Sequence, residues 1–377
     1  MNRKGVRGMT LGDVAANLDL VPTGVIYYFR NKEELAQACL LTGIERFNAF
    51  LEAGEAGSDP RARIDLFLQA YLDFRRRVAL GEDEAFAAFN DVRALNAAVV
   101  NEAYVAMFRR LRGLLQAPGW PRPALNARTH LVLSEVLWTV AWLHRRDAED
   151  YPGVATRMVS MISDGLAAPG AAWAPVALPR LMTEAGRDSS EQFLRAATAL
   201  INEEGYLGAS VEKISARLNV TKGAFYHHND TKDDLVQACF ERTFQVMRST
   251  IRQAEAVSTN GYQTLATIAA ALVDYQMSGD APLLRTSALT SVPEAIQPRL
   301  LDQFDRISFR FASIVSDGIA DGSLRPVDAN VAAQMVTGMI NASADLHFWV
   351  QDLTSETAAD LYARPFFEGL LTAGAGA

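Results

Sequence analysis

An eight-residue stretch occurs twice in this sequence with small changes, as KEELAQAC from Lys32 and as KDDLVQAC from Lys232, and this limits the folds that the chain can adopt. Shifting the sequence against itself by 200 positions aligns residues 5–40 with residues 205–240 without a gap, and nine of the 36 pairs are identical. Chance would give roughly two or three identities, so an internal duplication is the economical explanation. The similarity returns late in each copy, where AWLH at residues 141–144 matches ADLH at residues 344–347.

The remainder of the chain has helical periodicity. Apolar residues recur at spacings of three and four in residues 64–78, 99–115, 124–143 and 327–350, and strictly alternating β-branched runs are absent. The sequence therefore predicts an all-α protein of two similar units. Residues 169–188, whose first half is rich in Ala, Pro and Gly, are expected to be a linker between them.

Each unit is expected to begin with a helix-turn-helix domain and to continue as a helical bundle. The expected boundaries are residues 1–46 and 47–168 in the first unit, and residues 189–245 and 246–377 in the second.

Within each repeated segment, Thr10 or Ser210 is a suitable N-cap for a short helix. A tight turn and a second short helix follow, and in the first copy Pro22 suits the first helical position. A third helix is expected to begin near Lys32 or Lys232. Its inner face is predicted to carry Leu35, Ala38 and Cys39 in the first copy, and Cys39 and Cys239 are expected to be free thiols. Two short helices joined by such a turn match the helix-turn-helix unit, whose second helix enters the DNA major groove.

Three small helices can also pack together without any partner, so the side chains of the second helix decide between the two interpretations. The second copy gathers hydroxyl, imidazole and ammonium groups that can reach phosphates and base edges. These residues are Thr221, Lys222, Tyr226, His227, His228 and Lys232. Between Lys213 and Lys232 four basic residues face Asp230, a local balance of 4 − 1 = +3 in a chain of net charge −8. DNA binding is therefore the favoured interpretation.

The stretches LVPTGVIYYFRNKEEL and VTKGAFYHHNDTKDDL resemble the DNA-binding domain of the tetracycline-repressor (TetR) family of transcriptional regulators. The shared pattern is an aliphatic residue, Ser or Thr, a helix start with small residues, aromatic residues, and then Lys followed by acids and Leu. Residues 321–341 resemble the approach to the helix that this family uses in dimerisation. The resemblance covers nearly the whole chain, twice.

The resemblance implies specific DNA contacts in the second copy: Tyr226, His228 and Lys232 to the backbone, with Lys222, Gly223 and His227 near base edges. The matching backbone positions in the first copy are Ile26, Tyr28 and Lys32. Ile26 departs from the family pattern, and the neighbouring Tyr27 is the expected substitute. The second copy departs at Asn229, where the first keeps Phe29. The remaining residues expected at the DNA are Thr10, Thr23, Gly24, Ser210 and Thr221.

A first helix is expected only in the second copy, where Phe193, Ala197, Leu200 and Ile201 form an apolar stripe. In the first copy only four residues precede Gly5. Either the given chain begins too late, or the first DNA-binding unit lacks the helix that supports the other two, at the cost of core contacts and DNA affinity.

Other functions find little support in the sequence. The neighbouring His227 and His228 point about 100° apart on a helix and lack further ligands at suitable spacing, so no metal site is expected. There is no phosphate loop or catalytic arrangement, hence neither an enzyme nor a cofactor is expected. The longest nearly apolar run, residues 131–143, is too short to cross a membrane, and without a signal peptide the protein is expected in the cytoplasm.

The sequence thus predicts a tandem TetR-like regulator, expected to be a repressor of transcription that binds double-stranded operator DNA and is released by a small apolar effector. The two copies are expected to pair within the chain through their last two helices, as a pseudo-dimer on an operator with unlike half-sites. A homodimer of tandem chains is the other assembly left open. The alternative function is a ligand-sensing or protein-interaction scaffold in which one or both helix-turn-helix units no longer bind DNA.

Overall fold

A computed structural model describes residues 1–2, 5–89, 92–116, 119–179, 189–219, 231–278, 282–285, 288, 292, 296–351 and 353–371 of the chain. In these residues the secondary structure is helical, and the only β-pairing is an isolated bridge between Ala167 and Leu324. The prediction of an all-α protein is confirmed.

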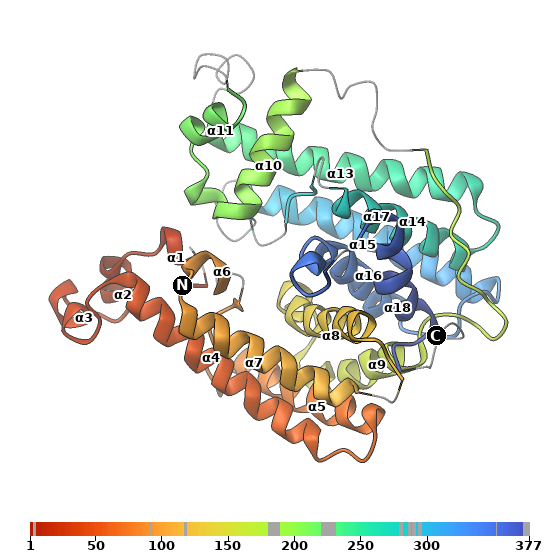
Figure 1. Ribbon diagram of the computed structural model, residues 1–377, viewed down its shortest axis with the longest axis horizontal. Coiled ribbons are helices and arrows are strands. Elements are labelled where there is room, and N and C mark those ends of the chain that lie inside the picture. Colours follow the sequence, from red (N-terminus) through yellow and green to blue (C-terminus); the bar gives the residue numbers. More distant parts are fainter. Residues whose placement is uncertain are drawn as a thin grey trace.

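Helices follow one another in a similar order in the two halves of the chain (Figure 1). The first half contains α1 (Gly5–Gly8), α2 (Leu11–Asn17), α3 (Pro22–Tyr28), α4 (Lys32–Glu55), α5 (Pro60–Ala79), α6 (Val92–Leu95), α7 (Ala98–Leu115), α8 (Arg122–Trp142), the 3-10 turns η2 (Leu143–Arg145) and η3 (Ala148–Asp150), and α9 (Tyr151–Asp164). The second half contains α10 (Ser189–Gly208), α11 (Val211–Arg217), α13 (Lys232–Val257), α14 (Gly261–Met277), α15 (Gln297–Ala320), α16 (Ala329–Ser343), the 3-10 turn η6 (Leu346–Phe348), α17 (Ser355–Ala358), the π-helical turn η7 (Ala359–Ala363) and α18 (Arg364–Glu368).

Equivalent turns in the two halves share an uncommon backbone conformation. Asp19 and Asn219, 200 positions apart, both lie in the left-handed region, with φ of 53° and 54°. Asp and Asn tolerate this region because their short polar side chains can bond to the nearby backbone. Gly5 and Gly205 also share a positive φ, of 63° and 73°. The same positions therefore redirect the chain in both halves.

The two long helices α4 and α13 begin where the sequence predicts, at Lys32 and Lys232. Asn31 and Thr231 cap them, because their side-chain oxygens accept hydrogen bonds from the backbone N–H groups of Glu34 (2.8 Å) and Asp234 (3.1 Å). Both helices run through the domain boundaries expected at residues 46 and 245.

The expected inner face of α4 was partly wrong. Leu35 and its neighbour Ala36 are buried, but Ala38 and Cys39 are both only half-buried. The helix turns 100° per residue, so positions 35, 36, 39 and 40 share one side, whereas position 38 points away from its centre. In the second half Cys239 is fully buried, and both cysteines are free.

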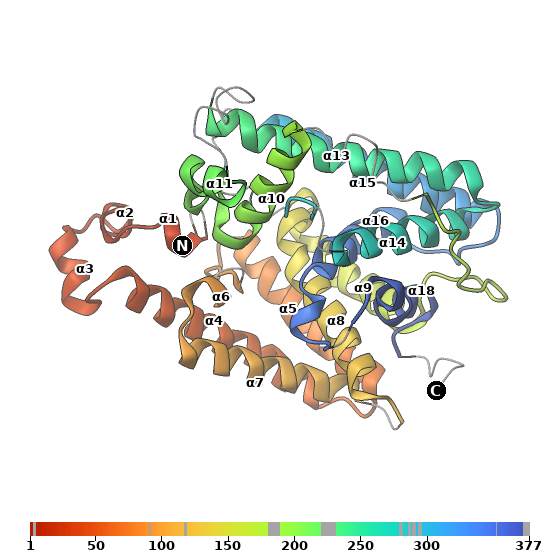
Figure 2. The ribbon, with the colours of Figure 1, turned by 45° about the horizontal axis from the view of Figure 1, so that its top comes forward.

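A central bundle joins the two halves. Helices α8 and α9 pack against α16 and against the stretch formed by η7 and α18 (Figure 2). Backbone hydrogen bonds cross between the halves: Leu166 N–H donates to Phe367 O at 2.9 Å, and Leu370 N–H to Ile162 O at 2.8 Å. Arg325 Nε donates to Gly165 O at 2.6 Å. The last two helices of each half thus share one continuous core.

The last helical stretch of the second half accommodates one extra residue. Leu143 and Leu346, 203 positions apart, are both fully buried and each opens a 3-10 turn. Gly165 and Gly369, which end the last helices, are 204 positions apart. The π turn η7 lies between these two pairs, and its i to i+5 bonding absorbs the additional residue without ending the helix.

The described part of the expected linker, residues 169–179, packs on the second half. Trp173 Nε1 donates to Asp360 Oδ1 at 2.8 Å, and Val176 N–H donates to Thr267 Oγ1 at 3.0 Å. None of the helices in the described ranges combines the length and the apolarity that a bilayer crossing requires.

Candidate nucleic-acid interface

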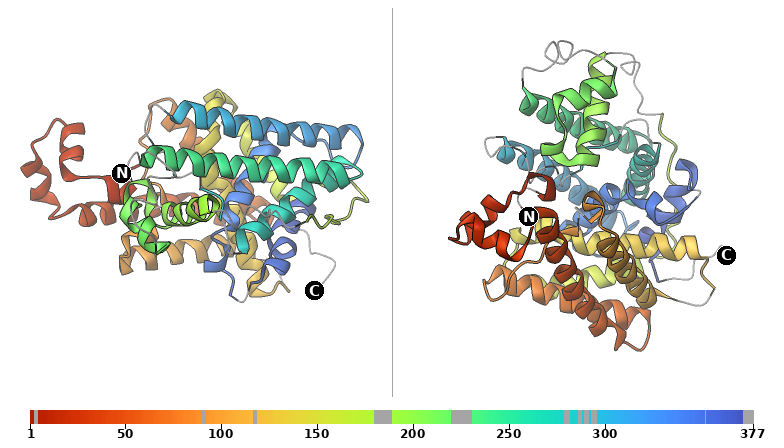
Figure 3. Two further views of the ribbon diagram at one scale, coloured as in Figure 1. Left: turned by 90° about the horizontal axis from the view of Figure 1, so that it is seen from above. Right: turned by 60° about the vertical axis from the view of Figure 1, so that its left-hand side comes forward.

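The first helix-turn-helix head, residues 5–31, projects from one end of the molecule (Figure 3). Thr10 caps α2 as predicted: its Oγ1 accepts the N–H of Asp13 at 3.0 Å. The same hydroxyl donates to the Asp13 carboxylate at 2.8 Å, so its proton is engaged within the head. Helix α3 begins at Pro22, at the predicted position.

The outer surface of α3 is exposed and mainly aromatic or apolar. Tyr27 and Tyr28 are 82% and 73% exposed, and their rings meet edge to face at 5.1 Å. Thr23 is exposed as well. A Cβ built on Gly24 would meet no atom within 4 Å, so internal packing does not require the glycine and the backbone there stays accessible. These four predicted site residues lie together on one surface.

The second head contains α10, α11 and the start of α13. Ser210 caps α11 by accepting the N–H of Lys213 at 3.2 Å. Phe193, Ala197, Leu200 and Ile201 are buried, which confirms the apolar stripe predicted for its first helix. The expected reading segment, residues 220–230, lies outside the described residues. Six of the predicted DNA-binding residues are in it: Thr221, Lys222, Gly223, Tyr226, His227 and His228.

The two lysines expected at the DNA backbone both contact the end of the first helix of their own half. Lys32 Nζ donates to the carbonyl oxygen of Arg7 at 2.9 Å. Lys232 Nζ lies 4.3 Å from the ring centre of Tyr206, a cation–π contact. Burial lowers the pKa of Lys232, and the neighbouring Asp233 opposes this shift. Both lysines therefore connect the start of a long helix to the end of the first helix of the same half.

The positive balance expected in the second head is reduced by the first helix. Arg217 forms a two-pronged pair with Glu203, with N–O distances of 2.7 and 2.8 Å, and Lys213 pairs with Glu204. The count from residue 213 to 232 omitted these acids because they lie earlier in the chain. Lysine has an uneven distribution: all five lysines of the chain lie within the expected helix-turn-helix domains, residues 1–46 and 189–245, and they are Lys4, Lys32, Lys213, Lys222 and Lys232.

The first head has a smaller core than the second. Helix α1 is a single turn, whereas α10 spans 20 residues. Leu18 is 61% exposed, while its counterpart Leu218 packs against the main core. The head keeps a small separate core that includes Val6, Ala15 and Val25. The expectation that the first copy loses core contacts is consistent with this difference.

The two heads touch through their first helices. Arg7 Nη1 on α1 lies 3.2 Å from Glu204 Oε2 on α10. The same glutamate binds Lys213. A Cβ on Gly208 would lie 3.3 Å from Arg7 Cδ, so the helices approach closely at this point.

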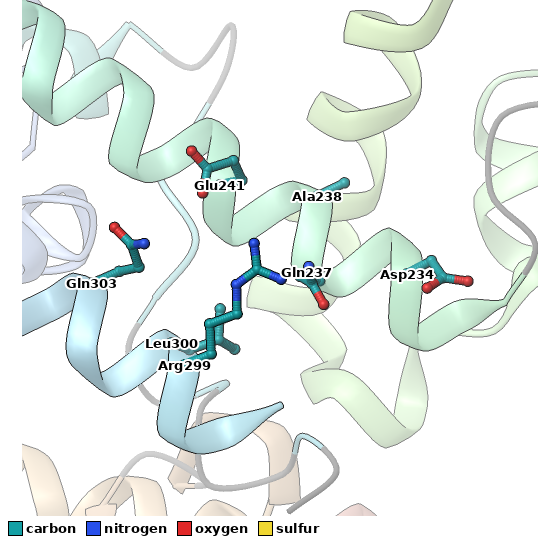
Figure 4. A pocket seen from close by; sticks show the side chains of 7 residues that line it. All are labelled: Asp234, Gln237, Ala238, Glu241, Arg299, Leu300 and Gln303. Carbon is teal, nitrogen blue, oxygen red and sulfur yellow. The ribbon is translucent and has the colours of Figure 1, made fainter. Parts of the chain in front are cut away.

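Two hollows lie along the groove between α13 and α15. The first, of about 300 Å³, follows the second head, and Figure 4 shows Arg299 reaching from α15 toward Gln237 on α13. The second, of about 290 Å³, is lined by Arg248, Ile251, Arg252, Glu255, Arg306, Ile307 and Arg310. Most of the lining residues are polar or charged, but their apolar atoms contribute most of the surface of both hollows. In the described part of the chain no group of three or more His, Cys, Asp or Glu side chains is placed to hold a metal ion.

Comparison with known proteins bears on the second head. Residues 193–239 match the family model described as bacterial regulatory proteins, tetR family. The matched residues begin in α10, span α11 and the reading segment, and end in α13. The segment that combines a capped helix, a left-handed turn and Lys232 is therefore similar to a tetR-type DNA-binding domain.

Two curated proteins and one solved structure illustrate what the chain is similar to. The TetC protein of transposon Tn10 from Escherichia coli is 26% identical over 157 residues, which cover 40% of this chain and 76% of TetC. The transcriptional repressor DhaR of a Mycobacterium species (strain GP1) is 26% identical over 131 residues, covering 34% of this chain and 66% of DhaR. Among solved structures, AibR in complex with isovaleryl coenzyme A and operator DNA aligns with a TM-score of 0.40 at 20% identity, covering 48% of this chain and 98% of AibR.

Proposed function

We propose that this chain is a transcriptional regulator of the tetR family, and that it is a repressor whose two halves pair with each other to place two unlike heads on DNA. The observation that carries this proposal is the match of residues 193–239 to the tetR family model. The confinement of all five lysines to the two heads adds support, because phosphate contacts supply much of the affinity for DNA. The residues proposed to contact DNA are those predicted from the sequence.

Pairing within one chain is supported by the central bundle. Its helices come equally from both halves, and main-chain hydrogen bonds cross between them at 2.8 and 2.9 Å. Away from these bonds, Trp349 of the second half stacks on Phe108 of the first, with ring centres 3.5 Å apart and planes 8° apart. A tetR-type dimer would place its heads about 34–36 Å apart, in successive major grooves. One folded chain would then serve as the pseudo-dimer.

An operator with unlike half-sites follows from the two reading helices. The first presents PTGVIYY and the second carries KGAFYHH at the equivalent positions. Lysine and histidine donate hydrogen bonds to base edges, whereas valine, isoleucine and the tyrosine ring favour apolar contacts such as thymine methyl groups. The two heads should therefore prefer different sequences.

Release by an effector is proposed to act through the long helices. Helices α4 and α13 have 24 and 26 residues and run from the heads into the body, about 36 and 39 Å at 1.5 Å per residue. The effector is proposed to be a small apolar molecule. The first half offers a packed aromatic core in which Phe47 contacts Phe67, Tyr71 and Phe89 at 5.6 to 5.9 Å between ring centres. A ligand that displaced these rings would tilt α4 and move the first head.

A gel-shift titration with the DNA upstream of the protein's own gene tests the DNA-binding proposal, at several salt concentrations. Specific binding should exceed binding to random DNA by about a thousandfold or more. Equal affinity for both would reject a repressor. His228→Ala compared with Tyr28→Ala separates the heads, since a silent Tyr28→Ala would mean that only the second head binds DNA.

A second candidate, a protein-interaction scaffold, is favoured by one observation in the first head. Four large apolar side chains near its turn and reading helix are about half exposed or more: Leu18, Leu20, Val21 and Ile26. Such a surface suits a protein partner as well as it suits DNA.

Sedimentation measures the oligomeric state of the protein. A mass near 41 kDa supports pairing within the chain, and about twice that mass supports a homodimer of tandem chains.

A further inference from the structure

The two halves can be compared residue by residue at their interface. AWLH at residues 141–144 and ADLH at residues 344–347 fix an offset of 203, and the buried Leu143 and Leu346 open equivalent turns at that offset. With this offset Glu135 of the first half corresponds to Gly338 of the second, and Trp138 corresponds to Asn341. After the π turn the offset is 204, so Gly165 corresponds to Gly369.

Counterparts touch each other at two places. A Cβ built on Gly338 would lie 3.2 Å from Glu135 Oε2, and a Cβ built on Gly165 would lie 2.5 Å from Gly369 N. In a two-fold assembly, a residue meets its own counterpart only on the symmetry axis. The pseudo-two-fold axis of the molecule therefore passes between Glu135 and Gly338 at one point and between Gly165 and Gly369 at another.

The interface is unequal at the first of these points. On α8 the large side chains of Glu135 and Trp138 project toward α16, where Gly338 leaves room for them. A Cβ on Gly338 would come within 2.9 Å of Trp138 Cδ1 and Cγ, so even a methyl group would collide with the indole ring. The arrangement is a knob on α8 filling a hole on α16.

Symmetric pairing would lose this fit. Two α8 surfaces would bring Glu135 against Glu135, and Trp138 of each against Glu135 of the other, with a steric collision and two carboxyl groups sharing a buried site. Two α16 surfaces would place Gly338 opposite Gly338 and leave a void. Both alternatives cost stability, whereas the observed pairing avoids both costs.

We propose that the Glu135–Trp138 surface of α8 and the Gly338 surface of α16 form a heterotypic lock, which pairs unlike halves and disfavours pairing between two copies of either half. This inference rests on the proposed pairing of the two halves and adds the residues that make it selective. Selectivity of this kind combines a favourable fit with a penalty against the competing partner.

The burial of Glu135 fits a selective rather than a stabilising role. Its side chain is 1% exposed, and in the described residues neither carboxyl oxygen meets a donor in hydrogen-bonding geometry. Burial raises the pKa of Glu135 well above its usual range, and the nearby amide of Met339 offsets this only in part. An isolated buried acid destabilises the fold, but it penalises a second acid beside it even more.

Exchanging the knob and the hole in the full chain tests the lock by urea unfolding. Glu135→Gly with Trp138→Asn empties the knob, and Gly338→Glu with Asn341→Trp places knobs on both helices. Each pair should lower the unfolding midpoint. All four changes together move the knob to α16 and should recover at least half of the summed loss. If both pairs are neutral, or if the combined protein loses the sum of both, the proposal is wrong.

A double-mutant cycle with smaller changes tests the same proposal if the protein with large side chains on both helices does not fold. Gly338→Ala should lower the midpoint of the wild-type chain but not that of a Trp138→Ala chain, because alanine lacks the Cγ and Cδ1 atoms that the new methyl meets. Equal losses in the two backgrounds would contradict the lock. Neither experiment contains DNA, so a failed gel shift would reject the repressor and leave this result standing.

Discussion

Arg7 on α1 and Glu204 on α10 form an ion pair of 3.2 Å that connects the first helices of the two heads directly. The first head has only a small core of its own, so this contact and the continuous helix α4 are its main ties to the rest of the chain. The Arg7 side chain is 41% exposed, and exposed pairs contribute little to global stability. The pair is therefore better suited to orient the first head than to stabilise the fold.

Replacing Arg7 by alanine should change the free energy of unfolding by less than about 1 kcal/mol. Hydrogen exchange in α2 and α3 should nevertheless become faster, because the head loses its contact with α10. Arg30→Ala is the matched control, since Arg30 is an exposed arginine of the same head. Unchanged exchange in α2 and α3 of the Arg7→Ala protein would argue against an orienting role.

Lys232→Ala should weaken DNA binding evenly across sequences and reduce its salt dependence, because Lys232 is proposed to contact the DNA backbone. Losing one phosphate contact lowers the slope of log K against log salt by about 0.9. Gel shifts of the wild type and the variant at four or more salt concentrations measure that slope. Arg306→Ala removes an exposed positive charge on α15, outside the heads, and should leave the slope unchanged. Equal slopes for the wild type and Lys232→Ala would mean that this lysine does not contact a phosphate.

The counterparts Leu18 and Leu218 should respond differently to truncation. Leu18 is 61% exposed, so Leu18→Ala should cost less than about 0.5 kcal/mol. Leu218 packs against the main core, and Leu218→Ala should cost about 1 to 2 kcal/mol. Urea unfolding of the two variants gives the comparison. Similar losses would show that the first head is covered in solution as well as the second.

Local sequence signals predicted much of this architecture. Capping residues, Pro22 and the repeated lysine placed the starts of α3, α4 and α13, because a helix start depends on neighbours within a few positions. The apolar stripe of α10 and the helical stretches that became α5, α7, α8 and α16 followed from periodicity. These features need no knowledge of distant contacts.

What the sequence missed depends on residues far apart in the chain. The carbonyl that receives the Lys32 side chain belongs to residue 7, and the acids that neutralise Lys213 and Arg217 lie on another helix. The fit between Trp138 and Gly338 joins positions 200 residues apart. No local pattern encodes such pairs, and the duplication became informative about them only when the two halves could be compared in space.

The pH dependence of stability should carry the signature of Glu135. Its pKa in the folded state lies well above its ordinary value of 4.5, because burial disfavours the carboxylate. Between the two pKa values the folded state holds one proton more than the unfolded state. The contribution of Glu135 to the free energy of unfolding is therefore fully present below about pH 4.5 and is lost as pH rises toward the folded pKa, by up to about 1.36 kcal/mol per pH unit.

Burial also lowers the pKa of His130, but this group is present in both proteins of the comparison. Glu135→Gln keeps the shape without the titrating proton, so urea unfolding from about pH 5 to 8 should show a shallower decline in the variant than in the wild type. Parallel curves for the two proteins would mean that Glu135 is ionised in the folded bundle.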